Sequence, residues 1–303
     1  MTAAEAQSPR ISARPAAGGV AVRGEFVDIG GRRLRVVRAG PAQSARPTVV
    51  LEHGAFGCAA DWQVVQDRLA AKGLKSLAYD RAGLGFSEPG PLPRDGRAIV
   101  ADLAALLDAL GETEPVVLVG HSMGGLMVRL FALTHPKRVL GLVLVDAVTP
   151  EVMASAVGAH AVRAFRQMLR LSAVTARLGL HRPIAVVAGD RILLGREASA
   201  EKRRIWGSPS HARGSSQEVD QWPVTSDQAK AKDLPARMPV AVVTAGAAET
   251  QTVLKEIQMI PAIASRAGYI EHVPKATHAS LLGRKHADPI VRGVEHVLVS
   301  VKR

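Results

Sequence analysis

Blocks of apolar and polar positions alternate along the chain from Glu25 onward. Short runs that are almost wholly apolar, such as Val116-Val-Leu-Val and Leu142-Val-Leu-Val, alternate with longer segments whose apolar residues recur every three or four positions. The clearest of these segments, Arg97 to Leu110, places its large apolar residues on one helical face and stops at Gly111. Wholly apolar strands that alternate with amphipathic helices indicate a parallel sheet with helices on both faces.

This alternation divides the chain into three parts. Residues 1–23 are rich in small residues, Pro and Arg, and we expect them to form a flexible tail. Residues 24–150 and 238–303 hold the strand-forming runs, which predicts one α/β core with its last strand at Gly268 to Val273 and a closing helix at Arg292 to Val301. Residues 151–237 lack such runs and are expected to form a helical insertion between two strands of that core.

The composition supports a single globular core. A chain of 303 residues with 47% hydrophobic positions can bury a large core, and its one cysteine, Cys58, allows neither an internal disulfide nor a Cys-rich metal centre. No apolar run approaches the roughly 18 residues that a membrane span needs. We therefore expect a cytoplasmic protein without stable membrane insertion.

The net charge of +12 raises the question of a nucleic-acid partner. Half of this excess lies in residues 151–237, where 14 Lys and Arg stand against 8 Asp and Glu. The arginines are scattered, however, and aromatic residues make up only 3% of the chain, which leaves few rings to stack on bases. We predict a solvated basic surface and no binding of nucleic acid.

A glycine-rich junction follows the predicted strand Val116 to Val119. Its sequence, Gly120-His-Ser-Met-Gly-Gly, has the pattern G-x-S-x-G between a strand and a helix. In this setting a sharp turn projects the serine hydroxyl from the sheet edge, and the glycines avoid collisions within the turn. The start of the helix points backbone N–H groups at the same place. The pattern predicts that Ser122 is a nucleophile.

A dinucleotide-binding turn is the competing interpretation of a glycine-rich junction between a strand and a helix. That turn requires G-x-G-x-x-G, and here Ser122 occupies the second glycine position. The sequence also lacks H-E-x-x-H and a phosphate-binding lysine loop. We therefore predict that the protein requires neither a nucleotide cofactor nor a metal ion.

Three motifs in order make the chain resemble the α/β-hydrolase fold family over residues 24–303. They are His53-Gly-Ala-Phe-Gly after a strand, Tyr79-Asp-Arg-Ala-Gly-Leu-Gly-Phe-Ser after the next strand, and the serine junction. The resemblance implies an α/β fold with a mostly parallel, doubly wound sheet and a helical cap after the sixth core strand, where residues 151–237 fall. It also implies that nucleophile, acid and histidine follow one another along the chain.

The resemblance further implies partners for Ser122. Acyl transfer needs two backbone N–H groups aimed at the developing oxyanion, and the residue after the nucleophile, Met123, supplies one of them. Ala55, which follows the His-Gly pair, corresponds to the other donor in the family. His278 follows the last predicted strand by a short loop, as the catalytic histidine does in the family, and a serine hydroxyl needs such a base.

The acid of this arrangement has two candidates. Glu249 is the only carboxylate near the usual position, in the loop after the strand Pro239 to Thr244. Asp146 directly follows Leu142-Val-Leu-Val on a more rigid mount, and some family members place their acid there. Either carboxylate would orient the imidazole and stabilise its cation, so both remain candidates at this stage.

These residues together predict a cofactor-independent serine hydrolase that acts on a small acyl substrate, most simply a carboxylic ester, through an acyl-enzyme. Hydrolysis of amides, peptides, thioesters or carbon–carbon bonds and perhydrolysis use the same residues, and fold and triad do not separate them. Two further hypotheses stay open: a non-catalytic ligand-binding protein, and a lipase whose basic 151–237 segment acts at a lipid surface.

Overall fold

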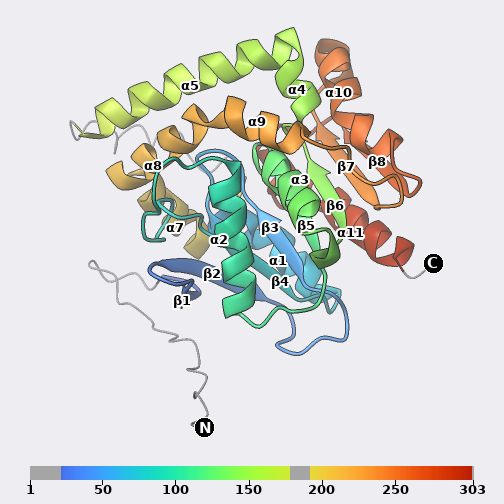
Figure 1. Cartoon of the computed structure of the whole chain (residues 1–303), viewed down its shortest axis with the longest axis horizontal. Coiled ribbons are helices and arrows are strands. Elements are labelled where there is room, and N and C mark those ends of the chain that lie inside the picture. The colour runs from blue at the N-terminus through green and yellow to red at the C-terminus, as the bar shows by residue number, and fades with distance from the viewer. Residues whose placement is uncertain (1–21, 178–191, 302–303) are drawn as a thin grey trace.

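An eight-stranded sheet runs through the middle of the molecule, of which the computed structural model describes residues 22–177 and 192–301 (Figure 1). The strands lie in the order β1-β2-β4-β3-β5-β6-β7-β8. The pairs β1–β2 and β2–β4 are antiparallel, and the strands from β4 to β8 run parallel. Their bounds are β1 Glu25–Asp28, β2 Arg33–Ala39, β3 Val49–Glu52, β4 Ser76–Tyr79, β5 Val116–His121, β6 Val139–Val145, β7 Val240–Ala245 and β8 Gly268–Val273.

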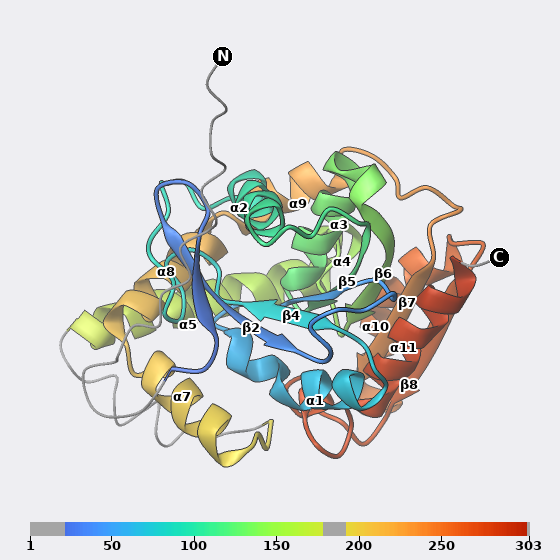
Figure 2. The ribbon, with the colours of Figure 1, turned by 90° about the horizontal axis from the view of Figure 1, so that it is seen from below.

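Helices cover both faces of the sheet (Figure 2). Helices α1 (Gln63–Ala71) and α11 (Asp288–Ser300) pack on one face. Helices α2 (Gly96–Ala109), α3 (Gly124–Thr134) and α10 (Ala248–Ile263) pack on the other. The central strands β3, β5 and β7 are consequently buried at every residue, as their continuous apolar runs predict. The expected doubly wound, mostly parallel sheet is confirmed.

A helical segment connects β6 to β7, where the sequence places an insertion after the sixth strand. In Figure 1 its helices α5 and α9 lie on the side of the molecule where α3 begins. The segment contacts the core chiefly through α9, which packs on α2 and α3. Its described helices are α4 Pro150–Ala154, α5 Ala156–Arg177, α7 Arg196–Trp206, α8 Pro209–Asp220 and α9 Trp222–Lys230. Short 3₁₀ turns elsewhere are η1 Ala59–Trp62, η2 Pro136–Arg138 and η3 Ser280–Leu282.

Two of the expected segments lie partly outside the described residues, and a third expectation is wrong in detail. Residues 1–21 of the expected tail and residues 178–191 of the insertion lie outside the described ranges. The segment after β7, expected as a loop around Glu249, instead enters helix α10 at Ala248. The apolar residues at 253, 254, 257 and 260 recur at helical spacing, which explains the helix. Within the described ranges, no helix combines the length and apolar character that a membrane span requires.

Candidate active site

Ser122 occupies a strained turn between β5 and α3. Its φ of 53° lies in the left-handed region, which costs a non-glycine residue about 1–3 kcal/mol. Backbone hydrogen bonds hold the turn, because Ser122 N donates to Val145 O at 3.1 Å and Val148 N donates to Ser122 O at 2.8 Å. The side chain is partly exposed at the carboxyl end of the sheet. The surrounding sheet therefore stabilises a conformation that presents the hydroxyl to solvent.

The glycines around Ser122 allow this turn to pack tightly. A Cβ atom at Gly120 would lie 2.6 Å from the carbonyl oxygen of Gly124, and one at Gly124 would lie 2.5 Å from that of Glu52. A Cβ atom at Gly54, in the loop after β3, would lie 2.9 Å from the Ser122 Cβ. All three distances are shorter than real Cβ contacts, so any side chain at these positions would displace the turn or its neighbours.

Asp146 and His278 form a hydrogen-bonded pair close to this turn. Asp146 directly follows β6, its N–H donates to Val243 O at 2.7 Å, and its Oδ2 lies 2.6 Å from His278 Nδ1. Asp146 is buried, whereas the side chain of His278 is 52% exposed. Burial raises the pKa of Asp146, but the hydrogen bond and charge of His278, together with the Lys255 ammonium, outweigh burial and bring that pKa below its usual range.

His121, the residue before Ser122, lies between the serine turn and His278. Its ring centroid is 4.5 Å from that of His278, and its Nε2 lies 3.1 Å from the His278 carbonyl oxygen. A carbonyl oxygen can only accept, so Nε2 carries the proton. Burial, followed by the charge of His278, lowers the pKa of His121 to about 3. His121 is thus a neutral donor that bonds to the backbone of His278.

Two backbone N–H groups near Ser122 are available to an oxyanion. Among the described residues, neither the N–H of Ala55 nor that of Met123 finds a hydrogen-bond acceptor. Met123 is fully buried at the start of α3, where the indole of Trp222 from α9 donates to its sulfur. Trp222 in turn stacks on Phe165 of α5, with ring centroids 5.7 Å apart. Helices of the insertion therefore pack directly on one of the two predicted oxyanion donors.

The structure brings some of the predicted site residues together and leaves others apart. Asp146 and His278 are bonded, and His121 connects His278 to the serine turn. Within the described ranges, the Ser122 hydroxyl makes no hydrogen bond to His278; catalytic hydrogen bonds are often long until substrate binds. Glu249 lies in the first turn of α10, where its side chain falls outside what the structure describes.

Sequence reasoning missed a lysine beside the candidate acid. Lys255 of α10 extends its ammonium to Asp146 Oδ1 at 2.7 Å, and both side chains are buried. The available signal was a charged residue, Lys255, and a polar one, Gln258, on the helix face that packs against the sheet. Such positions are usually apolar, so a buried lysine there indicates an acidic partner.

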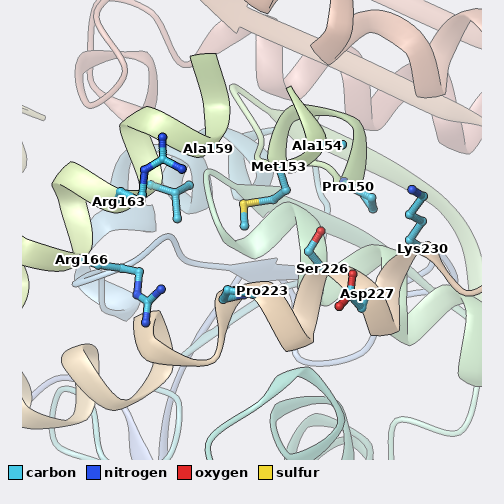
Figure 3. A pocket seen from close by; sticks show the side chains of 11 residues that line it. Pro150, Met153, Ala154, Ala159, Arg163, Arg166, Pro223, Ser226, Asp227 and Lys230 are labelled. Carbon is cyan, nitrogen blue, oxygen red and sulfur yellow. The ribbon is translucent and has the colours of Figure 1, made fainter. Parts of the chain in front are cut away.

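A cavity of about 370 Å³ lies within the helical insertion, between α4, α5 and α9 (Figure 3). Met153, Val162 and Pro223 contribute apolar surface, while basic side chains stand around the cavity: Arg163, Arg166 and Lys230. Met153 and Val162 also pack in the apolar cluster that contains Met123. Ser122, Asp146 and His278 are not among the lining residues, so the cavity neighbours the serine site without including it.

The described residues contain no cluster of His, Cys, Asp and Glu side chains arranged to hold a metal ion. The polar groups at the carboxyl end of the sheet form a different set: a hydroxyl, an imidazole, a carboxylate and free backbone N–H groups. Those groups can attack, transfer protons and stabilise an oxyanion. Side chains and backbone groups of this kind can together support acyl transfer.

Comparison with known proteins is consistent with this geometry. The family model of the alpha/beta hydrolase fold matches residues 47–226. The 2-hydroxy-6-oxo-2,4-heptadienoate hydrolase of Pseudomonas putida is 39% identical over 104 residues, which are 33% of this chain and 37% of that protein. The (Lyso)-N-acylphosphatidylethanolamine lipase of Mus musculus is 30% identical over 118 residues, which are 38% of this chain and 34% of that protein.

Solved structures extend the similarity over almost the whole chain. A thermophilic esterase from Thermogutta terrifontis superimposes with a TM-score of 0.64 at 20% sequence identity, covering 98% of this chain and 100% of the esterase. At this identity the likeness shows the fold alone. The chain spans less than half the length of the curated relatives it matches, so what those relatives act on does not transfer directly.

Proposed function

The chain belongs to the alpha/beta hydrolase fold family, and from this premise we propose that it is a serine hydrolase that cleaves a carboxylic ester through an acyl-enzyme. One observation carries the proposal. The hydrogen-bonded pair of Asp146 and His278 lies against the residue that precedes Ser122, and Ser122 is held in a strained turn at the start of a helix. In this proposal the nucleophile, the base and the acid come from three separate segments at the carboxyl end of the sheet.

In the proposed reaction, Ser122 Oγ attacks the carbonyl carbon of the ester while His278 Nε2 takes its proton. Asp146 holds the Nδ1–H of the imidazole and stabilises the cation that forms. The N–H groups of Ala55 and Met123 donate to the oxyanion. The tetrahedral intermediate then expels the alcohol, which receives the proton from His278. A water molecule, deprotonated by the same imidazole, releases the acid and restores Ser122.

Asp146 is the acid that we propose for this reaction. Its Oδ2 already bonds to His278 Nδ1, the nitrogen that faces away from the reacting proton, and its backbone is fixed by β7. The chain order of Ser122, Asp146 and His278 also agrees with the order of nucleophile, acid and histidine. We further propose that residues 151–237 form a cap that selects substrates, because α9 contacts Met123 directly.

The test combines an active-site label with a substrate panel. We expect a fluorophosphonate probe to label the protein once per chain and p-nitrophenyl esters of increasing acyl length to be hydrolysed, with a peptide arylamide as the amide control. Ser122→Ala should abolish both signals, whereas the exposed Ser210→Ala on α8 should leave both unchanged. A wild-type protein that neither labels nor turns over any ester would instead support a ligand-binding role.

A further inference from the structure

The carboxylate of Asp146 has two side-chain partners, and the proposed reaction uses only one of them. Oδ2 faces His278, whereas Oδ1 accepts from Lys255 Nζ at 2.7 Å and from the backbone N–H of Ala245 at 3.3 Å. Lys255 and Asp146 are 5% and 7% exposed. Among the described residues, Lys255 pairs with no other acid. The ammonium of Lys255 therefore forms its ion pair with the Asp146 carboxylate.

A buried lysine of this kind needs an explanation beyond stability. Moving an ammonium and a carboxylate out of water is costly, and replacing such a pair by apolar residues is often neutral or stabilising. Here the bond fixes the rotation of the Asp146 side chain, because Oδ1 is held by Lys255 and Ala245 while Oδ2 points to His278. The arrangement thus restricts the orientation of the group that must orient the imidazole.

Lys255 also alters the electrostatics around His278. Among the described residues, the titratable groups that contact this imidazole are Asp146 after β6 and His121 at the end of β5, and Lys202 of α7 acts on His121 in turn. Of these, only Asp146 carries a negative charge. Lys255 neutralises part of that charge from the opposite side of the carboxylate, so an imidazolium at His278 gains less from it.

We propose that Lys255 is a positioning residue that fixes the Asp146 carboxylate toward His278 and, through its charge, makes the imidazole a weaker base, which extends activity toward acid pH. The proposal rests on the proposed function of Ser122, His278 and Asp146. Only neutral His278 can accept the proton of Ser122, so a less basic imidazole keeps more of the enzyme competent below neutrality. The same loss of basicity slightly reduces the ability of His278 to take the proton of Ser122.

The experiment separates the charge of Lys255 from its hydrogen bond. Lys255→Gln keeps a donor without charge, Lys255→Met removes both, and Lys255→Arg keeps the cation. We expect the midpoint of the acidic limb of the kcat/KM profile to rise by about one pH unit in the Gln and Met variants and to stay in place in the Arg variant. We expect Lys255→Met to lose about tenfold more kcat than Lys255→Gln, because its carboxylate can rotate.

A control variant shows whether the loss of any ion-paired lysine has this effect. Lys75 is paired with Glu112 at the amino-terminal edge of the sheet, away from the site, so Lys75→Met should change thermal stability without moving the midpoint. An acidic midpoint that stays unchanged in both Lys255→Gln and Lys255→Met would overturn the proposal and leave Lys255 a purely structural residue.

The proposal can also be tested without turnover. Titration of the His278 imidazole by NMR in wild type, Lys255→Gln and Lys255→Met should show the same rise in its midpoint. If wild type fails to label with a fluorophosphonate, the proposed function fails, whereas the NMR titration still decides whether Lys255 acts on His278. If labelling succeeds and the titration shows no difference between the variants, only the role of Lys255 is refuted.

Discussion

Asp146 and Glu249 are the two candidates for the acid, and single substitutions can distinguish them. Asp146 faces His278 Nδ1 at 2.6 Å, and its replacement by Asn would favour the wrong tautomer of the imidazole while preserving shape. We expect Asp146→Asn to lower kcat by about 10³–10⁴-fold and Glu249→Gln to change it by less than about twofold. Steady-state kinetics on one p-nitrophenyl ester suffice. A large loss in Glu249→Gln with a mild one in Asp146→Asn would reverse our assignment.

A site residue could be predicted from the sequence where the pattern that marks it lies among its immediate neighbours. Ser122 and Met123 belong to a contiguous G-x-S-x-G pattern between a strand and a helix, so the sequence alone singles them out. The bond between Asp146 and His278 spans 132 positions, and that between Asp146 and Lys255 spans 109. No pattern of neighbours encodes such contacts. From the sequence alone, both Asp146 and Glu249 therefore remained candidates for the acid, and Lys255 had no predicted role.

Helix α8 is tied to the core by a buried ion pair. Glu218 accepts from Arg81 Nη2 at 2.7 Å, and the same guanidinium donates to the carbonyl oxygens of His53 and Gly54 at 2.6 and 3.1 Å. Arg81 and Glu218 are each about 1% exposed. One side chain of the core thus holds both the insertion and the loop that carries the predicted oxyanion donor Ala55.

We expect Glu218→Gln to lower the free energy of unfolding by about 3–5 kcal/mol, because the variant leaves the buried guanidinium without one of its charged partners. Asp220→Asn provides the control on the same helix, since Asp220 pairs with Arg166 and Arg170 at the surface and should cost less than about 1 kcal/mol. Urea unfolding of the two variants gives both values. Equal, small losses would show that the ion pair does not fasten α8 to the core.

Elements were more predictable where burial is uniform along a strand. The apolar runs of β5 and β6, which are almost wholly buried, lie where the pattern predicts. The expected strand Gly268 to Val273 is β8 with the same bounds, although its residues are exposed or half-buried. Helix α10 escaped prediction because it begins among small and polar residues and contains Pro261. The described part of the segment between β6 and β7 is helical, but its packing depends on distant partners such as Arg81 and Glu218, which periodicity does not reveal.

The molecule as a whole should lose stability in mild acid. Burial lowers the pKa of His121 to about 3, and burial followed by the charge of Arg81 lowers the pKa of His53 well below its usual value. Below about pH 6.5 the unfolded chain binds protons at these imidazoles and the folded chain does not. Their contribution is therefore present above that pH and is lost as pH falls, by about 1.4 kcal/mol per pH unit for each histidine.

Urea unfolding at pH 7, 6 and 5 measures this slope. His121→Gln should reduce it by about 1.4 kcal/mol per pH unit, because the amide keeps a donor for the His278 carbonyl and does not titrate. The exposed His160→Gln on α5 should leave the slope unchanged. A slope identical in wild type and His121→Gln would contradict the assignment of a neutral, buried imidazole at residue 121.

The route of the chain between β6 and β7 has a consequence for how such a protein can change over evolutionary time. The strands pair directly with each other, so the sheet is complete whatever length or shape the intervening helices take. Asp146 precedes that segment and Lys255 follows it, so lineages could exchange the whole connection while both residues proposed to orient His278 stayed in the core. New substrate preferences could then arise through changes in the segment between β6 and β7, while the proposed hydrolytic reaction stayed the same.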